Sequence, residues 1–142
     1  EACFKDVLAI IESARGVEEA CQIARVPGVV RLAFGSVDLA LDLGIDCDPE
    51  GTEDELLYFR SQVVLASRLG GLDAPADGVS TAIDDAVRLC ADAERARRLG
   101  FGAKLCIHPR QVAAVQAAFM PDAERMAWAR QPAGLPWPLA AR

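Results

Sequence analysis

VLAIIESARGVEEACQIARVPGVVRLAFGSVD, residues 7–38, contains two apolar runs on either side of one amphipathic segment. The run at 7–12 is apolar up to its last residue, Glu12, which is typical of a strand covered on both faces, and the run at 29–34 reads as a second strand. Between them, residues 16–25 carry apolar side chains at helical spacing, and Pro27-Gly28 then turns the chain. The stretch therefore predicts two neighbouring parallel strands joined by a helical crossover.

The same alternation continues along the rest of the chain. Thr52 followed by Glu55 is a capping-box pattern and predicts a helix that ends before Gly70-Gly71. The further elements expected are a long loop at 35–46, a weak strand at 74–80, a helix at 84–99, a strand at 102–107, a helix at 109–119 and a short helix at 122–130. Four strand–helix units predict an α/β fold, a parallel sheet with outer helices. A complete (β/α)₈ barrel needs about 250 residues, so this chain can form at most half of one.

The composition suits one folded domain whose cysteines are reduced. Of the 142 residues, 52% are hydrophobic, and the net charge of -6 argues against a nucleic-acid-binding protein, which needs clustered Lys and Arg. No apolar stretch approaches the roughly 20 residues of a membrane span, and no secretory signal is visible. The five cysteines form no C-x-x-C pair, which favours a cytoplasmic setting. Because residue 1 is Glu rather than Met, we expect a piece of a longer protein.

Two carboxylates follow the first two predicted strands. Glu12 ends the first apolar run, and Asp38 comes shortly after the second. The carboxyl ends of parallel strands meet at one edge of the sheet, so the two acids are expected to face each other across a crevice. A hard divalent cation such as Mg²⁺ would keep both ionised. The alternative from spacing alone is that each carboxylate caps or hydrogen-bonds the loop that follows it.

Four segments, taken in order, resemble the citrate lyase beta-subunit family. They are IIESARGVEEACQIA (10–24), RLAFGSVDLALDLGID (31–46), DGVSTAIDD (77–85) and ARRLGFGAKLCIHPRQV (96–112). This family belongs to the metal-dependent keto-acid aldolase superfamily and includes malyl-CoA and citramalyl-CoA lyases. The resemblance implies the second half of a TIM (β/α)₈ barrel, strands five to eight. It implies a half-barrel lyase domain at 1–130 and an irregular tail at 131–142.

The resemblance also implies the site. Glu12 and Asp38 match the family's metal-binding pair for Mg²⁺, and the turn Gly35-Ser36-Val37-Asp38 matches the amides that hold a keto-acid carboxylate. A turn without a ligand is the alternative for that segment. No catalytic residue is assigned beyond the metal pair. The arginine that the family supplies from its N-terminal half is absent, and so is the C-terminal aspartate that reaches a neighbouring subunit.

The expected activity is a Mg²⁺-dependent carbon–carbon lyase that cleaves a hydroxyacyl thioester of the citryl-, malyl- or citramalyl-CoA type. The expected partners are a small-molecule keto acid, a CoA or carrier-protein thioester and further copies of the chain in a homo-oligomer, with no nucleic acid and no membrane. Two alternatives stay open: a class II aldolase acting on free hydroxy-keto acids, and a non-catalytic truncated half-barrel.

Four other polar residues are candidates for a structural or functional role. His108, the one histidine, precedes Pro109 and is interpreted as a hydrogen-bonding residue at a helix start. Asp77 either lines the site or is a satisfied loop carboxylate. Arg31 and Lys104 lie within predicted strands, so each needs an acidic partner if it is buried.

Overall fold

The computed structural model describes residues 6–48, 52–121, 126–127 and 130. The irregular tail expected at 131–142 and most of the short helix expected at 122–130 lie outside these residues.

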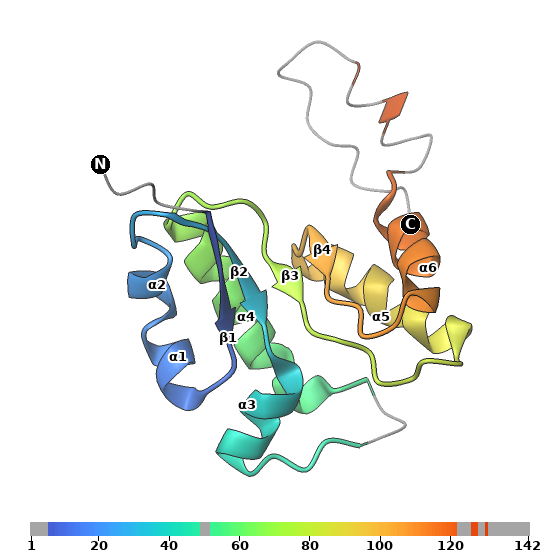
Figure 1. Cartoon of the computed structure of the whole chain (residues 1–142), viewed down its shortest axis with the longest axis horizontal. Helices are drawn as coiled ribbons and strands as arrows, with labels where there is room; N and C mark the ends of the chain where they lie inside the picture. The colour runs from blue at the N-terminus through green and yellow to red at the C-terminus, as the bar shows by residue number, and fades with distance from the viewer. Residues whose placement is uncertain (1–5, 49–51, 122–125, 128–129, 131–142) are drawn as a thin grey trace, which may run out of the picture.

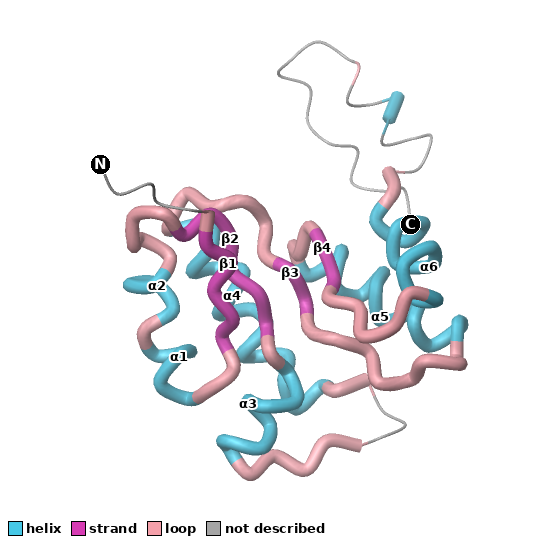
Figure 2. Tube along the Cα trace, viewed as in Figure 1, coloured by secondary structure: helices cyan, strands magenta, loops and turns pink. Residues whose placement is uncertain are grey.

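The described residues include a four-stranded parallel sheet with the strands in sequential order (Figures 1 and 2). The strands are β1 (Val7–Ile11), β2 (Val29–Phe34), β3 (Ala76–Asp77) and β4 (Ala103–Lys104). Ile11 pairs with Phe34 at the ends of β1 and β2, and Asp77 pairs with Lys104. This confirms the predicted α/β fold with a parallel sheet. A doubly wound sheet would reverse its strand order, whereas this one runs straight through.

The two later strands are shorter than the sequence predicts. Only Ala76–Asp77 and Ala103–Lys104 are paired as strands, in place of the ranges 74–80 and 102–107. Single hydrogen bonds extend the pairing slightly, from the Gly102 amide to the Pro75 carbonyl and from the Leu105 amide to the Asp77 carbonyl, both 2.9 Å long. Pro75 has no amide hydrogen to donate, which ends the ladder on that side.

Six α-helices and one 3₁₀ turn lie between or after the strands within the described residues. They are α1 (Ala14–Glu18), α2 (Ala20–Ile23), α3 (Ser36–Leu43), the 3₁₀ turn η1 (Asp54–Leu56), α4 (Leu57–Leu69), α5 (Ala86–Leu99) and α6 (Arg110–Phe119). The single helix expected at 16–25 is thus two short helices, with the break at Glu19, whose backbone (φ −92°, ψ 3°) leaves the helical range.

The core lies between one face of the sheet and the helices. Ile11, Leu32 and Phe34 of the strands pack there against residues of α2, α4 and α5, namely Ala20, Ala24, Val63, Ala66 and Ala96. On the opposite face β1 is open: Leu8 and Ile10 keep 46% and 49% of their surface exposed, while Ile11 keeps 1%. Successive strand residues point to opposite faces, so this contrast marks β1 as covered on one side, although Ala33 of β2, the partner of Ile10, is buried. The expectation that both faces of β1 are covered is therefore wrong for this chain.

The segment after β2 is helical, where the sequence analysis expected a loop. Leu39 is fully buried on α3, and Leu39 and Ala40 pack against the core, so tertiary contacts favour the helix. Gly44, with φ 66°, ends α3 in a left-handed conformation that glycine adopts without steric cost. Helix α3 places Asp38 in its first turn.

The capping box predicted at Thr52 is also wrong. The Thr52 hydroxyl donates to an Asp54 carboxylate oxygen at 2.6 Å, and Glu53 takes a left-handed backbone with φ 53°. Helix α4 therefore begins at Leu57, after the 3₁₀ turn. The side chain of Glu53 pairs with the guanidinium of Arg60, a contact that sequence spacing does not reveal.

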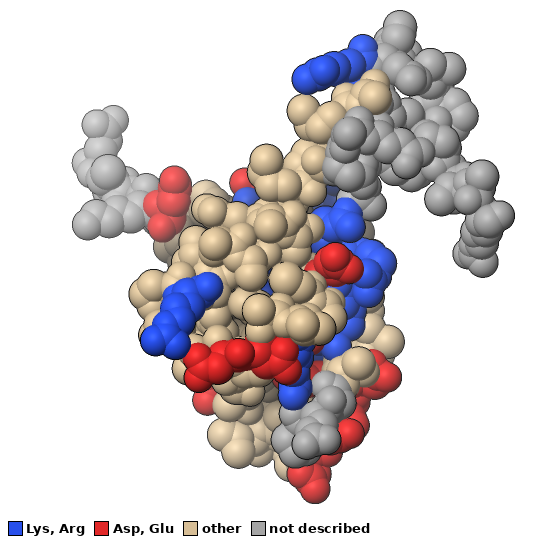
Figure 3. Space-filling view, turned by 90° about the vertical axis from the view of Figure 1, so that its right-hand side faces the viewer, with Lys and Arg blue, Asp and Glu red and all other residues tan. Residues whose placement is uncertain are grey.

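The outer surface carries charges of both signs. Figure 3 shows Lys and Arg side chains interspersed with Asp and Glu on the side of the molecule that holds α5 and α6. Arg110 pairs with Asp84 at 3.0 Å, and Arg98 pairs with Glu94 at 3.6 Å. None of the helices in the described ranges combines the length and apolarity that a membrane crossing requires.

Candidate functional site

Glu12 and Asp38 lie at the same edge of the sheet. Glu12 directly follows β1, and Asp38 lies in the first turn of α3, just after β2. The two strands are parallel neighbours, and the Gly35 amide donates to the Ile11 carbonyl at 2.9 Å. The two carboxylates therefore follow adjacent strand ends, as the sequence predicts for parallel strands.

Gly35 lets the side chain of Glu12 approach the turn that leads to Asp38. A Cβ atom placed on Gly35 would lie 2.5 Å from the Cβ of Glu12 and 3.0 Å from its Oε2. The Glu12 carboxylate thus lies over the Gly35 backbone, three residues before Asp38. Both acids are exposed, and among the residues the structure describes neither has a hydrogen-bonding or ion-pairing partner. The alternative that each caps its own loop finds no support here.

The carboxylates of Glu12 and Asp38 suit magnesium, but they fill only part of its coordination shell and leave positions for other oxygens. In the described part of the chain, no group of three or more His, Cys, Asp or Glu side chains is placed to hold a metal ion. Mg²⁺ is commonly held by one or two carboxylates, with water and substrate oxygens filling the remaining positions. Two unpartnered carboxylates beside a glycine turn fit that pattern.

The start of α3 offers donors for an anion. Its N-cap, Gly35, has no side chain to cap the helix, so the first amide groups of α3 stay free for other partners. The Ser36 side chain is 3% exposed, and its hydroxyl has no partner within the described residues. Ser36 and Val37 also line a cavity of about 220 Å³ between α3 and the segment that leads to α4. A buried hydroxyl without a partner is costly, so a ligand group or water there is favoured.

Asp77 belongs to a buried ion network on the helix-covered face of the sheet. Its Oδ1 accepts from Arg60 Nε at 2.9 Å, and its Oδ2 accepts from Lys104 Nζ at 3.1 Å. The side chains of Arg60, Asp77 and Lys104 are at most 2% exposed. Lys104 also donates to the Gly78 carbonyl at 2.7 Å. Asp77 is therefore a satisfied buried carboxylate, and the partner of Lys104 is Asp77, not the acids near the predicted metal site.

Arg60 extends this network to Glu53 and the aromatic core. It donates to the Glu53 carboxylate, and its guanidinium lies 5.0 Å from the centroid of the Phe34 ring. Burial alone would lower the pKa of Arg60, but the charge of Asp77 and the hydrogen bond to Glu53 outweigh it and raise that pKa. Sequence pattern alone does not identify Arg60, since nothing in a helical stripe marks an inward-facing arginine.

The thiol of Cys47 is also affected by Glu53. Burial, and secondly the charge of Glu53, raises the pKa of this thiol, which therefore stays protonated at neutral pH.

The network predicts a specific loss of stability in acid. Burial alone would raise the pKa of Asp77, but the charges of Lys104 and Arg60 outweigh it and lower that pKa below the ordinary value near ~3.9. A lowered pKa in the folded state gives stability that is present above the unfolded value and lost as pH falls through the folded value. We expect urea midpoints to fall as the pH drops below about 4, because the unfolded carboxylate takes up a proton there while the folded one stays ionised until a lower pH. An Asp77→Asn variant should lose part of that slope, and slopes that match those of the unmodified chain would contradict the prediction.

His108 helps to start α6. Its Nδ1 accepts from the Arg110 amide at 3.2 Å, while the Gln111 carboxamide accepts from the Ile107 amide at 2.9 Å. The interpretation of His108 as a hydrogen-bonding residue at a helix start is thus confirmed. Arg31, by contrast, reaches the exposed Asp73 at 3.5 Å, so it is paired at the surface.

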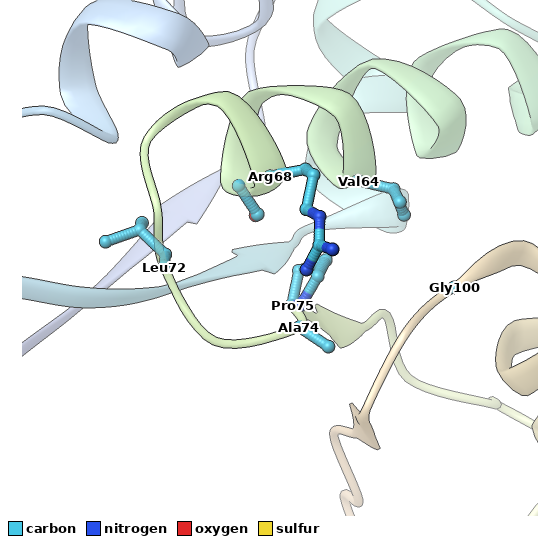
Figure 4. A pocket seen from close by; sticks show the side chains of 7 residues that line it. Val64, Arg68, Leu72, Ala74, Pro75 and Gly100 are labelled. Carbon is cyan, nitrogen blue, oxygen red and sulfur yellow. The ribbon is translucent and has the colours of Figure 1, made fainter. Parts of the chain in front are cut away.

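Another cavity, of about 330 Å³, lies at the opposite end of the sheet (Figure 4). It is lined by Ala74 and Pro75, which precede β3, and by residues near the ends of α4 and α5, including Arg68 and Gly100. The carboxyl ends of the strands, where Glu12 and Asp38 lie, are remote from this end. The larger volume therefore does not mark the candidate site.

Gly35→Ala tests the close approach of Glu12 to the turn. The added methyl group would lie 2.5 Å from the Glu12 Cβ, so the two strand ends must move apart. We expect a loss of about 1–3 kcal/mol in unfolding free energy, measured by urea denaturation. Gly44→Asn is the matched control, because the space there is open and asparagine tolerates the left-handed backbone. Equal midpoints for both variants would contradict the prediction.

Comparisons with known proteins identify the family. A family model described as HpcH/HpaI aldolase/citrate lyase matches residues 5–109. The chain is 46% identical over 124 residues to a citrate lyase subunit beta-like protein from Deinococcus radiodurans, with 87% of this chain and 43% of that protein covered. It is 34% identical over 114 residues to a (3S)-malyl-CoA thioesterase from Cereibacter sphaeroides, with 80% and 39% covered.

A solved relative agrees with these matches. The citrate lyase beta subunit from M. tuberculosis complexed with oxaloacetate and magnesium matches the fold with a TM-score of 0.73 at 33% identity, covering 82% of this chain and 53% of that one. The chain spans about half the length of the relatives it matches. Magnesium, the cation expected from the carboxylate pair, is the metal in that complex. The resemblance of the four sequence segments is thus confirmed: the chain belongs to the HpcH/HpaI aldolase/citrate lyase family.

Proposed function

We propose that this chain is part of a Mg²⁺-dependent carbon–carbon lyase that converts a hydroxyacyl thioester into a keto acid and an acyl thioester. One observation carries the proposal: the Glu12 carboxylate lies over the Gly35 backbone, at the start of the turn that leads to Asp38. Two unpartnered acids at adjacent strand ends, beside free helix amides, suit a divalent cation and a carboxylate together.

Each site residue has a role in this proposal. Glu12 and Asp38 hold the metal, which when bound acts as a Lewis acid toward the oxygen that becomes the keto group. The amides of the Gly35–Asp38 turn hold the carboxylate of the keto acid and orient it toward the two acids. This arrangement fixes the carbon that carries the hydroxyl group, so the bond to the neighbouring carbon is held in one geometry.

The reaction balances without water or an oxidant. The hydroxyl group loses its proton, the adjacent carbon–carbon bond breaks, and the thioester fragment takes the electron pair and then a proton. Cleavage of a carbon–carbon bond without water separates the lyase from a thioesterase, which consumes water and leaves the carbon chain intact. The name of the Cereibacter sphaeroides relative makes thioester hydrolysis the second activity to test.

A direct assay tests the proposal. The full chain is incubated with Mg²⁺ and, in turn, malyl-CoA, citramalyl-CoA and citryl-CoA, and the products are separated by chromatography. We expect a keto acid and an acyl-CoA in equal amounts, and no products in the presence of EDTA. Free CoA without a keto acid would indicate hydrolysis. A parallel incubation with a free hydroxy-keto acid tests the aldolase, and cleavage of that acid alone would indicate it. Absence of turnover, together with absence of metal-dependent keto-acid binding in a separate titration, would indicate a non-catalytic half-barrel.

The remaining proposals concern the surroundings of the site. The open face of the sheet, with Leu8 and Ile10 half exposed, is consistent with the interior of a barrel of which this chain forms strands five to eight. Covering that face by further chain or by copies of the protein in a homo-oligomer would bury these side chains. A cytoplasmic location stays part of the proposal.

A further inference from the structure

Asp42 makes a long-range hydrogen bond to the turn that carries Glu12. Its Oδ2 accepts from the Ala14 amide at 2.7 Å, across 28 residues of sequence. Ala14 is the first residue of α1 and follows Glu12 by two positions. Asp42 lies one helical turn beyond Asp38 on α3, and residues four apart share a helix face. This bond therefore joins the helix of one predicted metal ligand to the turn of the other.

Glu12 lies between two links to the same segment. Before it, the Ile11 carbonyl accepts from the Gly35 amide at 2.9 Å, and after it, the Ala14 amide donates to Asp42. The bond from the Gly16 amide to the Ser13 hydroxyl, 3.1 Å long, stays inside the turn and makes no link to α3. The backbone of Glu12 is thus fixed to the segment 35–42 on both sides.

We propose that Asp42 is a positioning residue, which sets the placement of the Glu12 carboxylate relative to Asp38. The inference rests on the proposed function, because it assumes that these two acids share a cation. Mg²⁺ demands near-ideal octahedral geometry at about 2.0–2.1 Å, so a ligand that shifts with its turn weakens binding. Groups that orient metal ligands typically change metal affinity by about 10–100-fold when they are removed.

Three variants of the full chain separate positioning from other roles. Asp42→Ala removes the acceptor, Asp42→Asn keeps an oxygen that can accept from the Ala14 amide, and Ser13→Ala removes a bond of the same turn without touching the link to α3. Mn²⁺, which is paramagnetic, serves as the probe for the metal, and its binding is measured by electron paramagnetic resonance. Hydrogen exchange of the Ala14 amide, measured in the absence of metal, reports the link itself.

We expect Asp42→Ala to bind Mn²⁺ about 10-fold more weakly and to exchange the Ala14 amide faster, while the other two variants stay near the unmodified chain. If Asp42→Ala speeds exchange but leaves Mn²⁺ binding unchanged, the positioning role is overturned. If Asp42→Asn binds as weakly as Asp42→Ala while the Ala14 amide stays protected, Asp42 acts through its charge, and the positioning role is again overturned. Failure of the unmodified chain to bind Mn²⁺ would overturn the proposed function itself and this inference with it.

Discussion

Asp77→Ala is expected to lower the free energy of unfolding by about 3–5 kcal/mol, the cost of breaking a buried ion pair from one side. The variant leaves Arg60 and Lys104 buried after the carboxylate that both contact is removed. Arg60 retains Glu53, and Lys104 retains the Gly78 carbonyl, so neither cation loses every partner. The loss should appear as a lower urea midpoint with an unchanged slope, followed by circular dichroism.

Asp73→Ala is the matched control for this prediction. Asp73 also pairs with a strand cation, Arg31, but at 3.5 Å and with 77% of its side chain exposed. Exposed pairs contribute about 0–1 kcal/mol, so this variant should unfold close to the unmodified chain. Similar urea midpoints for Asp73→Ala and Asp77→Ala would show that burial of the network does not increase its contribution to the free energy of unfolding.

A second variant keeps the prediction measurable if Asp77→Ala fails to fold. Lys104→Met removes one cation and leaves Asp77 with Arg60 at 2.9 Å. Asp77 then keeps one of its two cations, and the second carboxylate on Arg60, Glu53, is partly exposed, so the loss should be smaller than for Asp77→Ala. A larger loss for Lys104→Met would mean that the bond from Lys104 to the Gly78 carbonyl matters more than its charge.

The sequence predicts the parts of this fold that depend on local pattern. The largely apolar runs at 7–12 and 29–34 contain β1 and β2, because β-branched and aliphatic residues suit a pleated surface. Chain order then dictates that Glu12 and Asp38 follow neighbouring strand ends. Asp85 likewise caps α5 by accepting from the Arg88 amide at 2.9 Å, as an acidic residue before a helix predicts.

The features that the sequence misses depend on distant contacts. Helix α3 was expected to be a loop, because the burial of Leu39 against the core is invisible in a stretch rich in aspartate and glycine. The capping-box prediction at Thr52 is wrong because the Thr52 hydroxyl donates to Asp54 and Glu53 takes a left-handed backbone. The bond from Asp42 to the Ala14 amide joins two segments whose approach follows only from the assembled sheet.

Stability and ligand binding should therefore respond to different carboxylates. Asp77 is buried among cations and supports the fold. Glu12 and Asp38 are exposed and have no partner among the described residues, so their removal should change unfolding free energy by no more than about 0.5 kcal/mol. Carboxylates that contribute little to stability and have no partner within the protein are typical of residues whose role is binding.

Glu12→Ala and Asp38→Ala are each expected to abolish Mg²⁺-dependent binding of pyruvate or oxaloacetate. In the proposed site at most two protein carboxylates of the described residues would hold Mg²⁺, so losing either would leave one protein ligand and would prevent metal-dependent binding of the keto acid. Isothermal titration of the full chain with each keto acid, with and without Mg²⁺, measures the effect. Asp46→Ala is the matched control, since Asp46 is an exposed acid just beyond α3. Unchanged metal-dependent heat in either site variant would show that the pair does not share a cation, because the fold itself should remain intact in both.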